Sequence, residues 1–472
     1  MTNTGLSKFG LKVLDALTDT APRTVPKLFQ RAFLAVFGSE TFFRFHQRKY
    51  LRIAKEVKQR NDSLKGSSKI LFIADVCIGD AVLMGQCLPT LREIFPNAQI
   101  HYVCNRTGGE LIEGIPGNII VHNIIEGIHG MPSDADLKRL RTLLNTESYS
   151  LILNMSPFIT TRTLRMRSSK GVYPQVIPLY AAFATYMLRA WRWNGTREIS
   201  VLAVQYLREL LMWRKPPGLP APNASPEACA TLKLTNSVYL SRESIEMARA
   251  FLQSNNLSPG EGLLFFNPDA TSSYGTIPFE VQSQLLRSIA PMPHVRAVLL
   301  GTAYTNRAIE QQLILSLPEA FRHKIVLVPH VPIEEYSALI DAADMFISAD
   351  TGPLHIASCR KFLRSSNGQE PIPLRNRTAI VAIYGATDSR MYGYDSGQPH
   401  HIAANQDAPS KHFSGSAPCR NISCINKFGK SCKTVRCFDG LDTDEISDYI
   451  DSYFYERTNP LRMKLPVIEQ FA

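Results

Sequence analysis

Short apolar runs, each ending at small or acidic residues, are the feature that most constrains the fold of this chain. One such run, Lys69–Ala74, leads into the turn Gly79-Asp80 and then into a helical stretch that reaches about Phe95. Apolar runs of about four to eight residues between turns are typical of strands buried on both faces of a sheet. Their alternation with helical stretches predicts a parallel sheet with crossover helices, so the expected fold class is α/β.

The alternation of strand and helix occurs in two successive parts of the chain. Besides the first run, strands are expected at Gln99–Cys104, Asn118–Ile125, Ser148–Ser156, Gly262–Pro268, Val295–Gly301, Lys324–Val328, Asp344–Asp350 and Arg377–Gly385. Pro89 interrupts the first helical stretch, which predicts a kink or two short helices. Two α/β halves predict two facing Rossmann-like domains, with the ligand at the carboxyl ends of their strands.

Two polar or proline-rich stretches indicate where the domains begin and end. Residues 1–66 are expected to form a basic helical extension that ends in the linker NDSLKGSSK. The proline-rich segment Arg214–Ala228 divides the remainder into domains of residues 67–228 and 229–472. The polar stretch Cys359–Arg377 is expected to be an inserted surface loop.

The composition fits a folded protein with an anionic partner. The chain is 44% hydrophobic and 20% charged, and no apolar run reaches the roughly 18–20 residues of a membrane span. No signal peptide is recognised at the start, and nine cysteines in 472 residues argue against a secreted disulfide scaffold. A reducing cytosol is therefore the expected compartment. The net charge of +11 indicates a nucleic acid, an acidic lipid or a phosphorylated saccharide as partner.

Much of the positive charge lies in Arg44–Arg60, where Lys and Arg interleave with apolar residues such as Tyr50 and Val57. This segment fits a basic amphipathic helix on a membrane surface, or a solvated helix packed against the main body. The aromatic pair in Trp191–Trp193 allows either a membrane-interface contact or core packing. No helix-turn-helix, zinc-finger or aromatic RNA-binding signature accompanies the charge, so nucleic acid is not expected as a partner.

The stretch FISADTGPLHIASC combines a strand end with the features of an anion site. After the strand, Asp350, Thr351 and Gly352 make a turn, and Pro353 begins a helix that contains His355. A Thr or Asp at this position can cap the helix, whose free N–H groups and dipole favour a diphosphate. The alternative is an Asp cap with a packed histidine and no ligand.

A second loop, FFNPDATSSYGTIPFE at residues 265–280, also leaves an apolar strand. It is rich in Gly and hydroxyl residues, which can line phosphates with N–H and O–H donors. Ordinary turns share this composition.

Asp80 lies between the first strand and its helix, where an acidic side chain has two interpretations. It can cap the helix, or it can act as a general acid or base. One side chain can also do both.

Together these stretches resemble glycosyltransferase family 9, the ADP-heptose:lipopolysaccharide heptosyltransferases and their relatives. The resemblance is carried by KILFIADVCIGDAVLMGQCLPTLREIFPNAQIHYV, FFNPDATSSYGTIP, LVPHVPIEEYSALIDAADMFISADTGPLHIAS and AIVAIYGATDS, and covers roughly residues 69–105 and 262–390. The D-T-G-x-x-H-x-A segment is its most specific part. The resemblance implies the GT-B fold, with an acceptor domain at residues 67–228 and a nucleotide-sugar domain at residues 229–472.

The resemblance also implies the chemistry: sugar transfer that inverts the anomeric centre and uses no metal and no other cofactor. Asp80 matches the proposed general base of the family, and Asp350 and His355 match positions that touch the donor sugar or its phosphates. The leaving diphosphate would be met by two further segments, the turn Thr351-Gly352 and the loop Ala270-Thr271.

The implied partners are an ADP-heptose-like donor, a phosphorylated glycolipid acceptor such as a lipopolysaccharide core precursor, and an anionic membrane surface. The implied location is the cytoplasm, peripheral to the inner membrane. Two alternatives stay open: a transferase of the same fold with another nucleotide sugar and a non-lipid acceptor, and a non-catalytic nucleotide-sugar-binding or assembly protein.

Two departures from the family pattern favour these alternatives. Gly275 stands where many members have a Lys that neutralises the diphosphate, and Tyr304 falls at or near the place of a polar or acidic residue that binds the ribose in some members.

The C-terminal part also holds four cysteines, Cys419, Cys424, Cys432 and Cys437, separated by four, seven and four residues. This spacing leaves a structural metal, a disulfide or redox pair, and unligated thiols all open.

Overall fold

The chain divides into two compact units. One consists of Met1–Ser237 with Ser365–Pro371, and the other of Val238–Arg364 with Ile372–Ala472. The computed structural model describes residues 68–74, 78–126, 132–156, 159, 161–166, 168–169, 171, 173–179, 237–270, 275–301, 307–365, 370–374, 377–385, 387, 389, 408–416 and 436–458. The expected extension at residues 1–66 and the expected domain boundary at residue 228 lie outside these ranges.

The N-terminal unit is built on a parallel sheet of five strands in the order β3-β2-β1-β4-β5. The strands are β1 (Lys69–Ala74), β2 (Gln99–Asn105), β3 (Ile119–Ile125), β4 (Tyr149–Asn154) and β5 (Gln175–Pro178). The helices are α3 (Ile78–Gly85), α4 (Cys87–Ile94), α5 (Arg106–Ile112), α6 (Asp134–Thr146) and α7 (Thr161–Leu164). The strands expected from the sequence in this part of the chain are confirmed.

Both faces of this sheet are covered, which explains why β1 is apolar without alternation. Leu71 and Ile73 point to one face and pack in a cluster with Leu140 and Leu144 of α6. On the other face, the hydroxyl of Tyr102 donates to the carbonyl oxygen of Ala81 in α3 at 3.0 Å. Every residue of β1 after Lys69 is therefore buried.

The break after β1 follows the expectation from Pro89. The chain forms two short helices, α3 and α4, separated at Gln86. Pro89 then lies in the first turn of α4, where its missing N–H costs no helical hydrogen bond. α3 also packs closely on α5, because a Cβ on Gly108 would lie 2.5 Å from the Cβ of Ala81.

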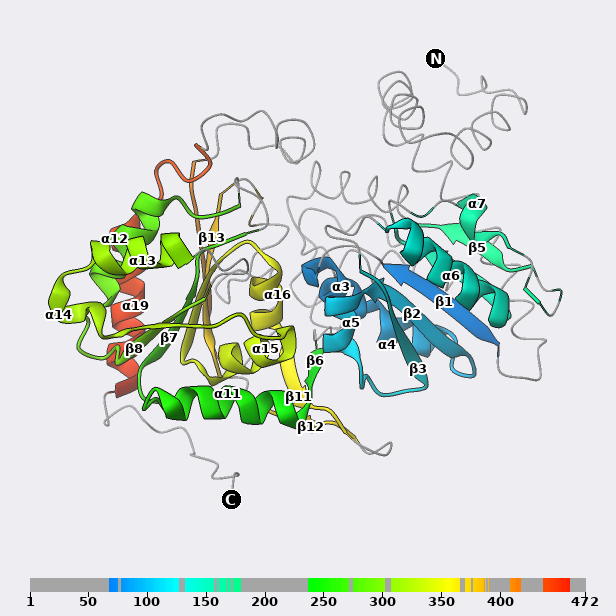
Figure 1. The fold of residues 1–472 in the computed structure, drawn as a ribbon, viewed down its shortest axis with the longest axis horizontal. Helices are drawn as coiled ribbons and strands as arrows, with labels where there is room; N and C mark the ends of the chain where they lie inside the picture. The colour runs from blue at the N-terminus through cyan, green and yellow to red at the C-terminus, as the bar shows by residue number, and fades with distance from the viewer. Residues whose placement is uncertain are drawn as a thin grey trace, which may run out of the picture. The chain divides into compact units, whose positions relative to one another are not determined.

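The C-terminal unit is built on a parallel sheet of six strands in the order β14-β13-β10-β7-β8-β9. The strands are β7 (Leu263–Asn267), β8 (Ala297–Leu300), β9 (Ile325–Leu327), β10 (Met345–Ala349), β13 (Ala379–Tyr384) and β14 (Ser410–Ser414). The helices are α11 (Arg242–Ser254), α12 (Phe279–Ile289), α13 (Arg307–Ser316), α14 (Glu319–Arg322), α15 (Ile333–Ala342), α16 (Gly352–Ser358) and α19 (Thr443–Thr458). Within this unit, α12, α13 and α19 lie on one face of the sheet and α15 and α16 on the other (Figure 1).

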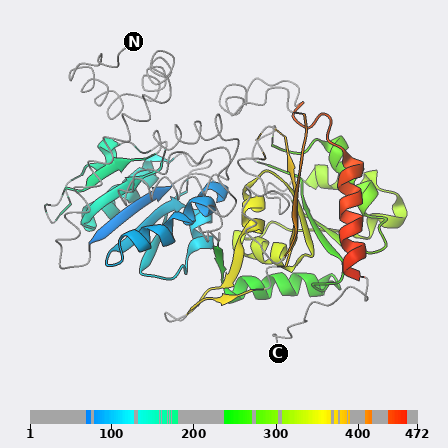
Figure 2. The same cartoon turned by 180° about the vertical axis from the view of Figure 1, so that it is seen from behind.

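Each face of this sheet has its own apolar core. Leu264 and Phe266 of β7 pack with residues of α12, α13 and α19, such as Leu286 and Ile450. The alternate residue Phe265 contacts Tyr336 of α15 on the other face, with ring centroids 5.0 Å apart. The red helix α19 is seen from behind in Figure 2, beside the strands that it covers. Burial of each large apolar side chain contributes on the order of 1.5–3 kcal/mol.

A buried carboxylate anchors the start of the central strand β7. Asp344 is fully buried, and its Oδ2 accepts hydrogen bonds from the N–H groups of Gly262 and Leu263, both at 2.9 Å. Its Oδ1 lies 2.9 Å from Nη2 of Arg457 in α19. Gly262 has a φ of +81°, and a Cβ there would lie 2.2 Å from the carbonyl oxygen of His294, so only glycine fits. The carboxylate thus joins β7, β10 and α19.

The expectation of a surface loop at Cys359–Arg377 is wrong. This stretch contains β11 (Arg360–Leu363) and β12 (Ile372–Pro373), which form a three-stranded sheet with β6 (Ser237–Leu240) in the order β12-β11-β6. Lys361 is fully buried, and its Nζ donates to the carbonyl oxygens of Ala357 and Cys359, both at 3.1 Å. These carbonyls lie at the end of α16, where a cation is favoured.

The expected α/β class, with two parallel sheets, is confirmed. None of the helices in the described ranges is long and apolar enough to cross a membrane.

Candidate active site

The order of strands in the C-terminal unit identifies where a ligand binds. From β7 the chain proceeds to β8 and β9 on one side, then returns to β10 on the other side of β7. In open α/β sheets, ligands bind outside the carboxyl ends of the strands at this switch of direction. The segments that follow β7 and β10 therefore form the candidate site of this unit.

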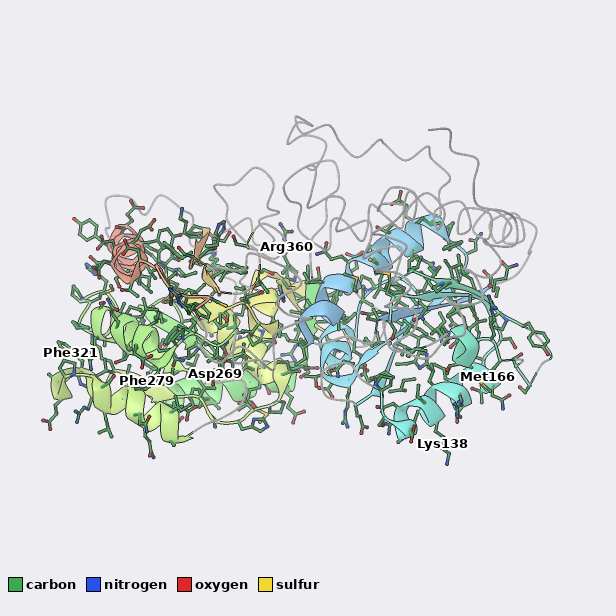
Figure 3. The ribbon with its side chains drawn as sticks, turned by 90° about the horizontal axis from the view of Figure 1, so that it is seen from above. Lys138, Met166, Asp269, Phe279, Phe321 and Arg360 are labelled. Carbon is green, nitrogen blue, oxygen red and sulfur yellow. The ribbon has the colours of Figure 1, made fainter. Side chains whose placement is uncertain are left out.

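The loop after β7 is closed at its base by three hydrogen bonds. The N–H of Ile277 donates to the carbonyl oxygen of Pro268 at 3.0 Å. The N–H of Ala270 donates to Oγ1 of Thr276 at 3.1 Å, and the same hydroxyl donates to the carbonyl oxygen of Ala270 at 3.2 Å. Asp269, labelled in Figure 3, belongs to this loop. Thr271 lies outside the described residues.

The turn after β10 leads directly into α16. Thr351 occupies the N-cap position, and its side chain makes no capping hydrogen bond. Its Oγ1 is buried and has no hydrogen-bond partner among the described residues. α16 begins at Gly352, and Pro353 lies in its first turn as expected. A hydroxyl held in this way is able to bond a ligand without breaking a bond within the protein.

His355 is a neutral group in this site at neutral pH. Its side chain is 9% exposed, and its Nε2 lies 3.7 Å from Oδ1 of Asp350, which is longer than a hydrogen bond. Burial lowers the pKa of His355 to about 4. At this separation the neighbouring carboxylate does not offset the loss of hydration. His355 can therefore exchange hydrogen bonds with a ligand at pH 7, but it supplies no positive charge.

We expect the buried His355 to make stability fall in mild acid. The pKa is about 6.5 in the unfolded chain and about 4 in the native protein, so between these pH values only the unfolded chain binds the proton. From pH 7 to pH 4.5 this should remove about 2.5 kcal/mol from the free energy of unfolding. Urea unfolding at both pH values measures it.

His355→Gln is the matched variant for this measurement. Between pH 7 and pH 4.5 its free energy of unfolding should fall by about 2.5 kcal/mol less than that of the wild type. His101 and His122, whose pKa values are also lowered by burial, contribute alike to both proteins. Equal losses in the two proteins would show that His355 titrates normally.

Two carboxyl groups interact at the loop after β7, Asp269 in the loop and Glu310 in α13. Burial, and then the negative charge of Glu310, raise the pKa of Asp269. Glu310 is fully buried in the first turn of α13. No local pattern indicated this pair, because the two residues lie in different loop and helix segments.

Asp80 lies at the corresponding place in the N-terminal unit. There the strand order turns between β1 and β4, and Asp80 is the third residue of α3, the helix that follows β1. It lies in the first helical turn and not at the N-cap position, and an acidic residue in that turn is favoured by the helix dipole. The backbone of Asp80 is described, whereas its side chain and residues 75–77 lie outside the described part.

The structure thus groups most of the residues singled out in the sequence. Ala270, Asp350, Thr351, Gly352 and His355 all follow the adjacent strands β7 and β10. Sequence reasoning missed the polar side chains that pack beneath them, Asn267 of β7, Ser348 of β10 and Tyr336 of α15. The sequence signal for one of them is Asn267, a polar residue at the end of the otherwise apolar strand β7.

The four C-terminal cysteines are only partly described. Cys437 is buried, and Cys419, Cys424 and Cys432 lie outside the described residues. Within the part of the chain that is described, no group of three or more His, Cys, Asp or Glu side chains is arranged to hold a metal ion.

Two Rossmann-like units in one chain, each with polar residues at the switch of strand order, are the architecture of GT-B glycosyltransferases. Residues 241–361, which include β7, β10 and α16, match the model of glycosyltransferase family 9 (heptosyltransferase). The resemblance found in the sequence is confirmed for this segment, and with it the enzyme class, a glycosyltransferase.

One solved structure with a TM-score above 0.5 shows a similar fold. A glycosyl transferase family 9 protein from Veillonella parvula is 16% identical, with a TM-score of 0.53 over 83% of this chain and 98% of its own. E. coli ADP-heptose lps heptosyltransferase II is 12% identical, with a TM-score of 0.48 over 82% and 98%. E. coli heptosyltransferase WaaC with ADP is 12% identical, with a TM-score of 0.45 over 81% and 99%. No curated protein matches the sequence.

Proposed function

We propose that this protein is an inverting, metal-independent glycosyltransferase that moves a sugar, heptose in our assignment, from a nucleoside-diphosphate donor to a phosphorylated glycolipid of the lipopolysaccharide-core type. One observation carries the proposal. The Asp350–His355 segment, which lies inside the matched region, follows β10 at the place where an open α/β sheet binds its ligand. Residues 229–472 would then form the donor domain and residues 67–228 the acceptor domain.

In this mechanism Asp80 is the general base. Its carboxylate takes the proton of the acceptor hydroxyl while the acceptor oxygen bonds to the anomeric carbon of the sugar. The bond from that carbon to the diphosphate oxygen breaks at the same time, and its electron pair leaves on the diphosphate. Attack opposite to the leaving group inverts the anomeric centre.

The charge that develops on the diphosphate has to be met largely by neutral donors. Gly275 stands where many family members have a Lys, and His355 is neutral at pH 7. The buried hydroxyl of Thr351, the backbone of Gly352 and the loop Ala270-Thr271 are the groups that we assign to it. Preorganised N–H and O–H groups can stabilise such charge where water is excluded.

The absence of the Lys at Gly275 also favours a second candidate, a protein that binds a nucleotide sugar without transferring it. A transferase of the same fold with another nucleotide sugar and a non-lipid acceptor is the remaining alternative. The three differ in whether ADP is released and in what receives the sugar.

We assign the acceptor to a membrane because of charge. The chain carries a net charge of +11, with a dense basic segment at Arg44–Arg60 that lies outside the described residues. Anionic phosphates on the acceptor and on the surrounding bilayer both attract such a segment. The protein would work in the cytoplasm, peripheral to the inner membrane.

Transfer from ADP-heptose to a core glycolipid in vesicles tests the function and the location together. The full chain should release ADP and yield a product with inverted anomeric configuration by NMR, with EDTA present. It should float with vesicles that contain anionic lipid and not with neutral vesicles. Binding of ADP-heptose without ADP release would support the non-catalytic alternative, and no binding would contradict the donor assignment.

A further inference from the structure

A chain of three buried polar side chains lies beneath the candidate donor site. They are Tyr336 of α15, Asn267 at the end of β7 and Ser348 in β10, and all three are buried. The hydroxyl of Tyr336 donates to Oδ1 of Asn267 at 2.6 Å, and Nδ2 of Asn267 lies 3.0 Å from Oγ of Ser348. All three lie within the stretches that carry the family resemblance, but none is among the candidate site residues named in those stretches.

The directions of these hydrogen bonds are fixed by chemistry. A carbonyl oxygen only accepts, so the second N–H of Asn267 donates to the carbonyl oxygen of Asp269 at 3.3 Å, which sets the amide with Nδ2 toward the loop. Oγ of Ser348 accepts from Asn267 and donates to the carbonyl oxygen of Ala349 at 2.8 Å. The hydroxyl proton of Tyr336 therefore points to Oδ1 of Asn267.

One amide thus ties together the two segments assigned to the donor. Through Asp269 the Asn267 side chain contacts the loop after β7, and through Ser348 it reaches the strand end from which the Asp350 turn departs. Without the Tyr336 hydroxyl, the amide oxygen would lack its described partner in a buried setting, and the amide could rotate. A buried polar group without a partner is strongly disfavoured, so the bonded arrangement is strongly selected.

The tyrosine itself is held in place by close packing. Its ring lies against Phe265, with centroids 5.0 Å apart. A Cβ on Gly301 would lie 2.8 Å from the Tyr336 hydroxyl and 2.5 Å from Cε2 of Phe265. Gly301, which follows β8, therefore leaves room for the Tyr336 hydroxyl at the position where it donates to Asn267.

We propose that Tyr336, Asn267 and Ser348 form a positioning relay that fixes the spacing of the two donor segments and so sets the affinity for the nucleotide sugar. This inference rests on the proposed function for the identity of the ligand. If the two donor segments are already held at the right spacing, they lose little conformational entropy when the nucleotide sugar binds, and the affinity is higher. The three residues touch no reacting atom in this assignment and act through the segments that they hold.

Tyr336→Phe tests the relay because it removes the hydroxyl and keeps the ring. Calorimetric titration with ADP-heptose should show affinity weakened about tenfold, the equivalent of one lost hydrogen bond of about 1.4 kcal/mol. The donor KM should rise similarly while kcat at saturating donor stays within about twofold. A variant that was merely part unfolded would lower kcat and leave KM unchanged, which would overturn the proposal.

Three further variants sharpen the test. Ser348→Ala should weaken binding by a similar factor, and the double variant Tyr336→Phe/Ser348→Ala should bind about as well as either single variant, because both act through Asn267. Additive losses would overturn the relay. Ser337→Ala is the matched control, because that hydroxyl donates only within α15, to the carbonyl oxygen of Ile333 at 2.7 Å. It should leave affinity and KM unchanged.

Hydrogen–deuterium exchange of the ligand-free protein separates this inference from the proposed function. The backbone amides of residues 269–270 and 349–352 should exchange about tenfold faster in Tyr336→Phe than in the wild type or in Ser337→Ala. This factor corresponds to the loss of the same single hydrogen bond. If the wild type binds no ADP-heptose, the proposed function fails and this exchange measurement alone decides the relay. Unchanged exchange in both segments would overturn it.

Discussion

Asp80→Asn should lower the rate of sugar transfer by about 10²- to 10⁴-fold, the usual contribution of a general base. The amide has nearly the shape of the carboxylate but cannot take a proton from the acceptor hydroxyl. Because the donor is assigned to the C-terminal unit, its affinity should stay within about twofold. Single-turnover assays with ADP-heptose, together with calorimetric titration of the donor, give both values.

Asp134→Asn is a suitable control for this variant. Asp134 is an exposed acidic residue of the same unit. Like Asp80 it lies in the first turn of a helix, here α6, but in a different segment. Its replacement should leave transfer unchanged. If Asp80→Asn retained most of the activity, Asp80 would act only through the dipole of α3. If it lost donor binding and activity in equal measure, the general-base assignment would be wrong.

The fold could be predicted from the sequence largely because its strands are buried on both faces. Such strands are short apolar runs that local pattern detects, and β1, β7 and β10 were found in this way. The hairpin of β11 and β12 was missed because β11 contains the buried cation of Lys361. What makes that burial tolerable is the pair of carbonyls at the end of α16, a tertiary arrangement that no local pattern reports.

In the candidate site, too, some features could be predicted from local sequence and others depend on tertiary contacts. Asp80, Asp350 and His355 follow strands directly, so chain order alone predicts their place at the carboxyl edges. The partner of Asn267 could not be predicted, because Tyr336 lies 69 residues away in a helix whose register only packing determines. The low pKa of His355 was equally hidden, since it depends on the burial of the side chain in the folded unit and not on the neighbouring Asp350.

The largest effect on stability is expected at Asp344, far along the strands from the site. Asp344→Asn should lower the free energy of unfolding of the C-terminal unit by about 3 kcal/mol. An amide has one oxygen and one NH₂ group. If the oxygen faces the two N–H groups of Gly262 and Leu263, the NH₂ group faces Arg457, and the reverse orientation sets NH₂ against the N–H groups. Either way a buried donor has no acceptor.

Arg457→Met should partly rescue this variant, which separates the geometric argument from a general loss of packing. With no guanidinium opposite, the amide of Asp344→Asn can turn its oxygen to both N–H groups. The loss caused by Asp344→Asn should therefore be smaller by about 1–2 kcal/mol in the Arg457→Met background than in the wild type. Urea unfolding of the four proteins gives this coupling, and Asp451→Ala, an exposed change on the same helix α19, should cost less than about 0.5 kcal/mol. A coupling near zero would mean that the introduced amide is tolerated in one orientation, and that Asp344 stabilises the unit by filling space and not by accepting three hydrogen bonds.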